Sequence, residues 1–301
     1  MHEFLVLMTL IFIQSIAFTQ NTSSHKNAVM ENTLNLFDYD KQADYQIHED
    51  SVFQKGNTVI RDISFASCNP VHGRVKAYMV IPSGEQPHSG IIYFHWLGRP
   101  NGNRKEFLEE AIEFAGLSTM SILIQGYFPW IEKPVSGEKD RQQVIDQTVD
   151  LRRAVDILLE QTGIDPGRIA FVGHDYGAMF GSVMAGIDKR IKAYVLVTGM
   201  GNFGDWSLKY WKNTASAGEE TYRKALAPFD PIGYIAKANP SALLFQFAEK
   251  DIFISKEVAL DFYNTASEPK SMRLYNTGHE MLIPEVKKDR VEWLKNQLGI
   301  E

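Results

Sequence analysis

The sequence is poor in cysteine and has no run of charges of one sign. Cys68 is the single cysteine among 301 residues, so no disulfide can form within the chain, and its apolar surroundings favour a buried packing role over a catalytic one. The formal net charge is −6, and acidic and basic residues are interspersed. This pattern argues against nucleic acid or an anionic membrane surface as a partner.

Signatures of cofactor binding are also missing. No glycine-rich phosphate loop or dinucleotide fingerprint follows an expected strand, so we expect no nucleotide cofactor. His95 and His174 have no further ligand-type residues nearby at metal-binding spacing, and we expect no metal. The chain has 44% hydrophobic and 12% aromatic residues, which suits one large α/β domain that binds a small-molecule substrate. The oligomeric state stays open.

The first residues have the pattern of an export signal. An apolar stretch runs from Phe4 to Phe18, and a polar segment follows at 19–24. This arrangement predicts a signal peptide at residues 1–19, a mature domain at 20–301 and a secreted or periplasmic protein. Because no Lys or Arg precedes the apolar stretch, an uncleaved membrane anchor is the alternative.

The rest of the chain changes its pattern once. Two alternating segments, 57–66 and 74–81, flank a turn with proline and glycine and predict an antiparallel hairpin. Continuous apolar runs with helical segments between them follow, which is typical of a parallel sheet covered on both faces. We expect strands at 91–94, 121–124, 169–172, 194–197, 242–245 and 272–275, helices at 104–116, 141–162, 177–186, 255–267 and 284–298, and a lid insertion at about 200–240.

The most informative segment connects an expected strand to an expected helix. The strand at 169–172 leads into Gly173-His174-Asp175-Tyr176-Gly177 and then into an apolar helix. A nucleophile elbow needs small residues two positions before and two positions after the reactive residue, because the tight turn leaves no room for side chains there. Gly173 and Gly177 meet this requirement, and the reactive position is Asp175.

Several segments in order resemble the dienelactone-hydrolase-like branch of the α/β-hydrolase superfamily. The resemblance runs from about residue 34 to the C-terminus, and the order of the segments is specific although each segment alone is weak. The segments are Phe94-His95-Trp96-Leu97-Gly98, Asn103-Arg104-Lys105-Glu106-Phe107, the elbow, Phe229-Asp230-Pro231-Ile232, Glu249-Lys250-Asp251 and Tyr275-Asn276-Thr277-Gly278-His279. The resemblance implies an α/β-hydrolase fold and ester or lactone hydrolysis.

The nucleophile departs from that branch, whose members place serine or cysteine in the elbow, and the chain contains no Gly-x-Ser-x-Gly. Its elbow instead resembles those of haloalkane dehalogenases and epoxide hydrolases, which implies attack by Asp175 on an sp³ carbon. A carboxylate is ionised near neutral pH and needs no base to become a nucleophile. On a carboxylic ester it would form an unfavourable mixed anhydride, so Asp175 would act there as a general base for water.

Two further residues complete an Asp-His-Asp triad. His279 follows the last expected strand, and Asp251 follows the strand before it, which is the order nucleophile, acid, histidine expected for this fold. His279 would activate water, and Asp251 would fix its tautomer. Glu249 is the reserve for the acid. A turn or capping role for Asp251 and a packed loop role for His279 are the alternatives.

The remaining predicted site residues stabilise charge or line the substrate cavity. The oxyanion donors are expected to be the N–H of Tyr176 and an N–H after the strand at 91–94, from Trp96 or Leu97. The Trp96 indole could bind a leaving halide or form a cavity wall. The predicted lining of the pocket is His95, Trp96, Tyr127, Phe128, Trp130, Trp206 and Tyr210, with Trp211 as a further candidate.

The sequence thus leaves three functions open. The first is hydrolysis of an ester or lactone, and the second is cleavage of a haloalkane or epoxide through an ester of Asp175. The small insertion counts against epoxide cleavage, which requires tyrosines in a cap; Tyr210 is the available one. The third is a binding protein on a hydrolase scaffold that has lost catalysis.

Overall fold

The structure, a computed structural model, describes residues 33–82, 88–98, 102–211 and 217–301. It divides into two compact units, Met1–Asp38 and Tyr39–Glu301. The described part of the first unit contains one 3-10 turn, η1 (Asn35–Phe37). The predicted signal peptide at 1–19 lies outside the described residues. Among the described helices, none is both long enough and apolar enough to cross a bilayer.

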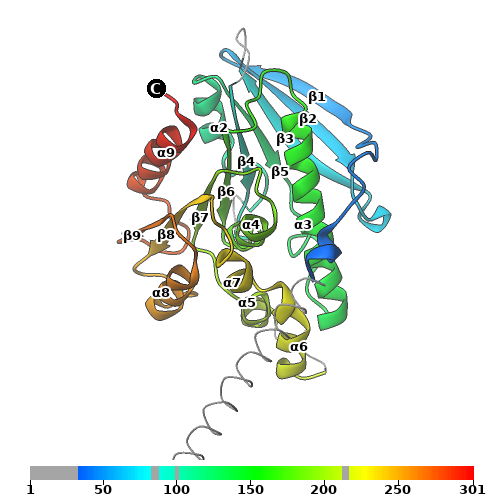
Figure 1. Cartoon of the computed structure of the whole chain (residues 1–301), viewed down its shortest axis with the longest axis vertical. Helices are drawn as coiled ribbons and strands as arrows, with labels where there is room; N and C mark the ends of the chain where they lie inside the picture. Colours follow the sequence, from blue (N-terminus) through cyan, green and yellow to red (C-terminus); the bar gives the residue numbers. More distant parts are fainter. Residues whose placement is uncertain (1–32, 83–87, 99–101, 212–216) are drawn as a thin grey trace, which may run out of the picture. The chain divides into compact units, whose positions relative to one another are not determined.

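The second unit is built on one twisted sheet (Figure 1), whose strands run in the order β1-β2-β3-β5-β4-β6-β7-β8-β9. The strands are β1 (His48–Lys55), β2 (Thr58–Ala66), β3 (Arg74–Pro82), β4 (Ser89–Phe94), β5 (Thr119–Ile124), β6 (Ile169–His174), β7 (Ala193–Val197), β8 (Ala242–Ala248) and β9 (Lys270–Tyr275). The strands from β4 to β9 pair in parallel, and β1, β2 and β3 pair antiparallel. The expected hairpin and parallel strands are confirmed.

One strand has no counterpart in the sequence-based expectation. Every residue of β1 is exposed, so the strand carries no apolar alternation that would reveal it. It is held by its antiparallel pairing with β2 at the edge of the sheet. β4, β5 and β6, in contrast, are buried along their whole length and produced clear apolar runs.

Helices cover both faces of the sheet, as expected. They are α2 (Leu108–Ala115), α3 (Gly137–Leu159), α4 (Tyr176–Ile187), α8 (Lys256–Thr265) and α9 (Pro284–Leu298), with a 3-10 turn η2 (Pro70–His72) between β2 and β3. Side chains of α2 and α9 share one apolar cluster with alternate residues of β4, β6 and β7, which places these helices on one face. α4 packs on the opposite face, where Gly181 lies against Phe171 and Leu196.

The insertion expected at 200–240 forms a group of short helices after β7. They are α5 (Phe203–Tyr210), α6 (Glu219–Leu226), η4 (Ala227–Phe229) and α7 (Pro231–Ile235). Asp230 joins the start of the insertion to its end, because its carboxylate accepts hydrogen bonds from the N–H of Phe203 and from the side chain of Asn202. Burial raises the pKa of Asp230 to about 7.

The strand order reverses between β4 and β6. The chain leaves β4 toward β5 on one side, whereas β6 lies on the other side of β4. In open α/β sheets, such a reversal leaves a crevice at the carboxyl ends of the strands, where ligands bind. The loop after β4 and the elbow after β6 meet at this point.

The elbow itself depends on close backbone approaches. Asp175 has φ 56° and ψ −118°, a conformation that non-glycine residues rarely adopt. A Cβ atom on Gly173 would lie 2.3 Å from the carbonyl oxygen of Gly177, and one on Gly177 would lie 2.1 Å from that of Phe94. Backbone atoms cannot yield as a flexible side chain can, so both positions require glycine.

We therefore predict that Gly177→Ala lowers the free energy of unfolding by about 2–3 kcal/mol, because the new methyl group forces β4 and α4 apart. Urea unfolding of the full chain measures the effect. Gly116→Ala is the control, since Gly116 caps α2 with helical dihedral angles, and it should leave stability unchanged or slightly higher. Equal stability of Gly177→Ala and the parent chain would contradict this account of the elbow.

Candidate active site

A cavity of about 340 Å³ opens at the carboxyl ends of the parallel strands. Its walls come from the loops after β4, β6, β8 and β9 and from the end of α5. The lining residues are Trp96, Leu97, Gly98, Asp175, Tyr210, Phe253, His279 and Glu280. The cavity therefore brings together the predicted nucleophile and the predicted histidine.

The two carboxylate oxygens of Asp175 have different environments. Oδ2 accepts a hydrogen bond from the N–H of Leu97 at 3.1 Å. Oδ1 is buried without a hydrogen-bond partner among the described residues and lies 3.9 Å from Nε2 of His279. Although Asp175 directly precedes α4, its side chain makes no capping hydrogen bond to that helix. One oxygen is thus held in place, and the other is left for a substrate or water.

Burial governs the charge of Asp175, whose exposed fraction is 2%. Desolvation raises the pKa of the carboxyl group, while the charges of His279 and His174 and the N–H of Leu97 act in the opposite direction. The net direction is upward. The ionised carboxylate is consequently less well solvated than an exposed one, which favours its reactivity as a nucleophile or base.

His279 is oriented by Asp251. Nδ1 of His279 lies 2.8 Å from Oδ2 of Asp251, and because a carboxylate only accepts, Nδ1 carries the hydrogen. Nε2 then faces Asp175 with its lone pair when the ring is neutral, and it has no hydrogen-bond partner among the described residues. Asp251 also accepts from the N–H groups of Phe253 and Ile254, so it both orders its own turn and binds the histidine.

The pKa values of this pair follow from their contact. Burial alone would lower the pKa of His279, but the hydrogen bond to Asp251 and the negative charges of Asp175 and Asp251 outweigh it and raise the pKa. Burial would likewise raise the pKa of Asp251, but the hydrogen bond and charge of His279 lower it. Glu249, the alternative candidate for the acid of the triad, is exposed, and it is Asp251 that contacts Nδ1 of His279.

Two side chains that we expected to line the pocket, His95 and Trp130, instead hold the loop after β4 in place by hydrogen bonds. His95 is buried and donates from Nδ1 to the carbonyl of Trp96 at 2.9 Å, while its Nε2 accepts from the N–H of Gly126 at 3.0 Å. Burial lowers the pKa of His95 to about 3, so the ring is neutral. Trp130 donates from its indole to the same Trp96 carbonyl at 2.7 Å. By binding the Trp96 carbonyl, both residues fix the backbone that precedes the Leu97 N–H, and neither lines the cavity.

The N–H of Trp96, one of two expected oxyanion donors from this loop, has another partner. It donates to Oε2 of Glu106 at 2.7 Å, so Leu97 is the residue whose N–H reaches Asp175. The indole of Trp96 stacks on the ring of His174, with the ring planes inclined by 2°. Tyr176 begins α4, where N–H groups have no intrahelical partner, and it stays the predicted second donor.

His174, next to the nucleophile, joins this loop to the loop that carries His279. Its Nε2 donates to the carbonyl of His279 at 3.1 Å, and its Nδ1 lies 2.6 Å from Oε1 of Glu106. Both ring nitrogens face acceptor oxygens, so the ring connects Glu106 to the backbone of His279. Trp96, Asp175 and His279 are therefore positioned by one hydrogen-bonded unit.

The residues expected to line the pocket lie in different places in the structure. Trp96 and Tyr210 lie in the wall of the Asp175 cavity. The ring of Tyr127 stacks on that of His72, at a centroid distance of 4.2 Å, and its hydroxyl donates to Asp150 of α3. Phe128 is buried, with an exposed fraction of 1%, and does not lie in the wall of this cavity. An aromatic residue near the end of a strand can face the core as readily as the crevice.

Trp206 lies close to the site without lining the cavity. It is fully buried, and its ring centroid lies 5.6 Å from that of His279 and 6.1 Å from that of Phe253. The Trp206 ring is therefore a buried neighbour of the His279 ring. Trp211 lies against Tyr176, with centroids 6.3 Å apart.

Sequence reasoning missed four residues of the site. Phe253 and Glu280 line the cavity, and their signal was their position beside Asp251 and His279 in sequence. Gly98 also lines the cavity, and its backbone lies so close to the Trp96 ring that a Cβ atom would clash with it. Glu106 was noted only as part of a family pattern, and nothing in the sequence indicates that it pairs with His174.

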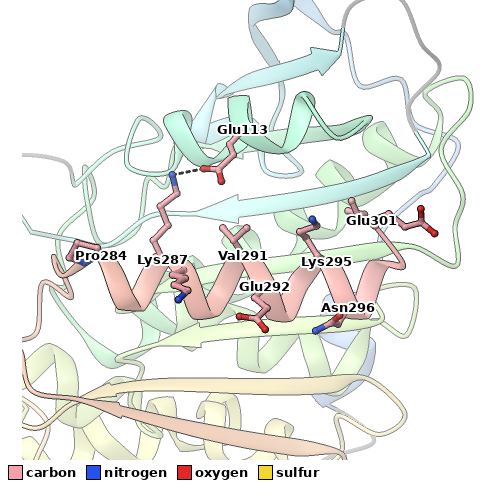
Figure 2. A pocket seen from close by; sticks show the side chains of 10 residues that line it. Glu113, Pro284, Lys287, Val291, Glu292, Lys295, Asn296 and Glu301 are labelled. Atoms are coloured by element: carbon pink, nitrogen blue, oxygen red, sulfur yellow. Dashed lines mark ion pairs between the residues drawn. The ribbon is translucent and has the colours of Figure 1, made fainter.

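A larger hollow of about 670 Å³ lies elsewhere, over α2 and α9. In Figure 2 most of the side chains that line it project from α9, and Lys287 forms an ion pair with Glu113. It shares no lining residue with the Asp175 cavity and contains no paired nucleophile and base. Within the described ranges, no group of three or more His, Cys, Asp or Glu side chains is arranged to hold a metal ion.

Comparison with known proteins identifies the fold. The sequence matches no protein-family model and no curated protein. In structure, the chain is similar to an acetyl xylan esterase from Paenibacillus sp. R4, with a TM-score of 0.72, 19% identity and coverage of 89% of this chain and 92% of the other. A second acetyl xylan esterase, from Thermoanaerobacterium sp., gives a TM-score of 0.70 and 13% identity over 90% and 93% of the two chains.

A putative dienelactone hydrolase from Klebsiella pneumoniae is similar over 80% of this chain and 98% of its own, with a TM-score of 0.60 and 14% identity. At such low identity the likeness establishes architecture and leaves the chemistry to the site. The chain has the α/β-hydrolase fold.

Proposed function

We propose that the chain is a hydrolase of a small organic substrate in which Asp175 is the nucleophile. This proposal rests mainly on the different hydrogen bonding of the two carboxylate oxygens of Asp175. Oδ2 is held by the Leu97 N–H, and Oδ1 is unpartnered beside Nε2 of His279. The N–H group that would receive a substrate carbonyl in a serine enzyme is thus already engaged by the nucleophile.

This arrangement favours attack on an sp³ carbon. Oδ1 donates an electron pair to a carbon that bears a halide or an epoxide oxygen. The electrons of the broken bond go to the halide, which departs, or to the epoxide oxygen, which remains attached to the substrate through its second carbon. Asp175 becomes an ester whose carbonyl oxygen is Oδ2. The Leu97 N–H keeps its hydrogen bond to that oxygen throughout this step.

The second step uses His279. Neutral His279 takes a proton from water at Nε2, and the water oxygen attacks Cγ of Asp175. Negative charge then develops on Oδ2, where the Leu97 N–H stabilises it. Asp251 stabilises the imidazolium that forms. Collapse of the intermediate releases the alcohol, which receives the proton held by His279. The second proton of the water remains on the carboxyl group of Asp175 and is lost when that group ionises, either to solvent with the halide or to the opened epoxide oxygen.

Ester hydrolysis is the second candidate, and the gap between Oδ1 and Nε2 favours it. These two acceptor atoms are 3.9 Å apart, so one water molecule can hydrogen-bond to both. Asp175 and His279 would then act as general bases on that water. The similar esterase structures support this reaction, whereas the engaged Leu97 N–H counts against it. A binding role without turnover predicts no reaction with any member of a panel of esters, lactones, haloalkanes and epoxides.

We also propose that residues 1–19 form a signal peptide that is removed during export. This proposal rests on the apolar stretch from Phe4 to Phe18 and its polar boundary. N-terminal sequencing of the protein from its native host tests it: a start near residue 20 supports cleavage, and an intact Met1 contradicts it.

The first prediction for the site concerns trapping. His279→Gln should react once with a haloalkane or epoxide substrate of the parent enzyme and stop at the ester, because no base activates the water. Intact-protein mass spectrometry should show a covalent adduct, and peptide mapping should place it on Asp175. The double variant Asp175→Asn/His279→Gln is the matched control and should stay unmodified. An unmodified His279→Gln variant would count against covalent catalysis.

The second prediction concerns pH. Turnover requires ionised Asp175 and neutral His279, and both pKa values lie above their ordinary values, so activity should be lost as pH falls. The acidic limb of the pH–rate profile should lie above 6.5, the ordinary pKa of histidine. Asp251→Asn removes the hydrogen bond that raises the pKa of His279. It should move the limb to lower pH and reduce turnover by up to about 10⁴-fold. An unmoved limb would contradict this assignment.

A further inference from the structure

The walls of the Asp175 cavity carry negative charge and no basic side chain. Among its lining residues, Asp175 and Glu280 are acidic, and none is Lys or Arg. Asp251 adds a third carboxylate behind His279, which is the one lining residue that can become positive. Lys209 is nearby on α5, but it donates to the carbonyl of Phe253 and is not among the lining residues.

Aromatic rings form much of the remaining wall. Trp96, Tyr210 and Phe253 line the cavity together. The rings of Tyr210 and Phe253 have centroids 5.5 Å apart, and those of Phe253 and His279 are 5.1 Å apart. Faces of aromatic rings carry partial negative charge and attract cations, and such walls are used to recognise quaternary ammonium groups.

The negative charges around the cavity also affect the pKa of the Tyr210 hydroxyl. Burial and then the charges of Asp175, Asp251 and Glu280 raise the pKa of this phenol. Three carboxylates from three different loops therefore act on one point of the cavity wall. Glu280 is exposed, and its carboxylate forms no ion pair with the other described residues.

A second observation points to a ligand at this place. Oδ1 of Asp175 is buried, lacks a hydrogen-bond partner among the described residues and belongs to the cavity wall. A volume of about 340 Å³ suits a small molecule. An anionic substrate would be repelled by the carboxylates, whereas a cationic group would be attracted by them and by the rings.

We infer that the cavity selects small substrates that carry an ammonium group, and that Glu280 and Tyr210 recognise this group. The inference rests on the proposed function for the reaction that follows binding, but the binding preference stands on the cavity alone. Cationic recognition therefore limits the substrate class of the proposed hydrolase to small ammonium compounds.

Three probes of similar shape test the preference without any turnover. Choline, 3,3-dimethyl-1-butanol and 3,3-dimethylbutanoate carry comparable branched head groups and differ in charge. Isothermal titration at low ionic strength should show choline binding at least fivefold more tightly than the neutral alcohol, and the anion binding more weakly than both. Added salt should weaken choline binding, because screening reduces the attraction.

Variants assign the preference to residues. Glu280→Gln keeps the shape and removes the charge, and it should reduce the ratio of choline to alcohol affinity at least threefold. Glu285→Gln, an exposed position outside the cavity lining, is the control and should not change the ratio. Tyr210→Leu removes a ring face at a partly exposed position and should weaken choline more than the alcohol.

Equal affinity for choline and the alcohol in the parent protein, or a ratio that Glu280→Gln leaves unchanged, overturns the inference. The outcome is separate from that of the proposed function. Cation-selective binding in a protein that forms no adduct on Asp175 would retain this inference and remove the mechanism. An adduct from neutral haloalkanes, in a protein that shows no preference for choline, would support the mechanism and overturn this inference.

Discussion

The hydrogen bond from the Leu97 N–H to Oδ2 of Asp175 is the interaction on which the site depends. A buried carboxylate without partners is costly, and burial raises the pKa of Asp175. The Leu97 N–H and the nearby imidazoles of His279 and His174 offset part of that cost. Since the hydrogen bond engages one oxygen, it also determines which oxygen is free to react.

That contact requires two backbone segments to be held in place. The elbow is set by glycines whose replacement would bring a Cβ atom within 2.3 Å of backbone oxygen. The loop after β4 is set by His95 and Trp130, which both bind the Trp96 carbonyl, and by Glu106, which binds the Trp96 N–H. Glu106 also pairs with His174, which binds the His279 carbonyl. Nucleophile, oxyanion donor and base are consequently positioned together.

The parts of this site that depend on local backbone geometry could be predicted from the sequence. Gly173 and Gly177 revealed the elbow, and the positions of Asp251 and His279 after two successive expected strands revealed their meeting at one edge of the sheet. Side-chain direction could not be predicted in the same way. Tyr127 follows its strand just as Trp96 does, yet its ring stacks on His72 and its hydroxyl binds Asp150. The pairing of Glu106 with His174 joins residues 68 positions apart and left no local pattern.

The central claim is that Asp175 forms a covalent ester, and isotope labelling of its carboxylate tests this most directly. The parent enzyme should complete a single turnover with a haloalkane or epoxide substrate in ¹⁸O-labelled water, followed by mass spectrometry of the peptide that contains Asp175. Hydrolysis of the ester at Cγ should place solvent oxygen in that carboxylate. Turnover that leaves the peptide unlabelled and puts all solvent oxygen in the product would contradict the account.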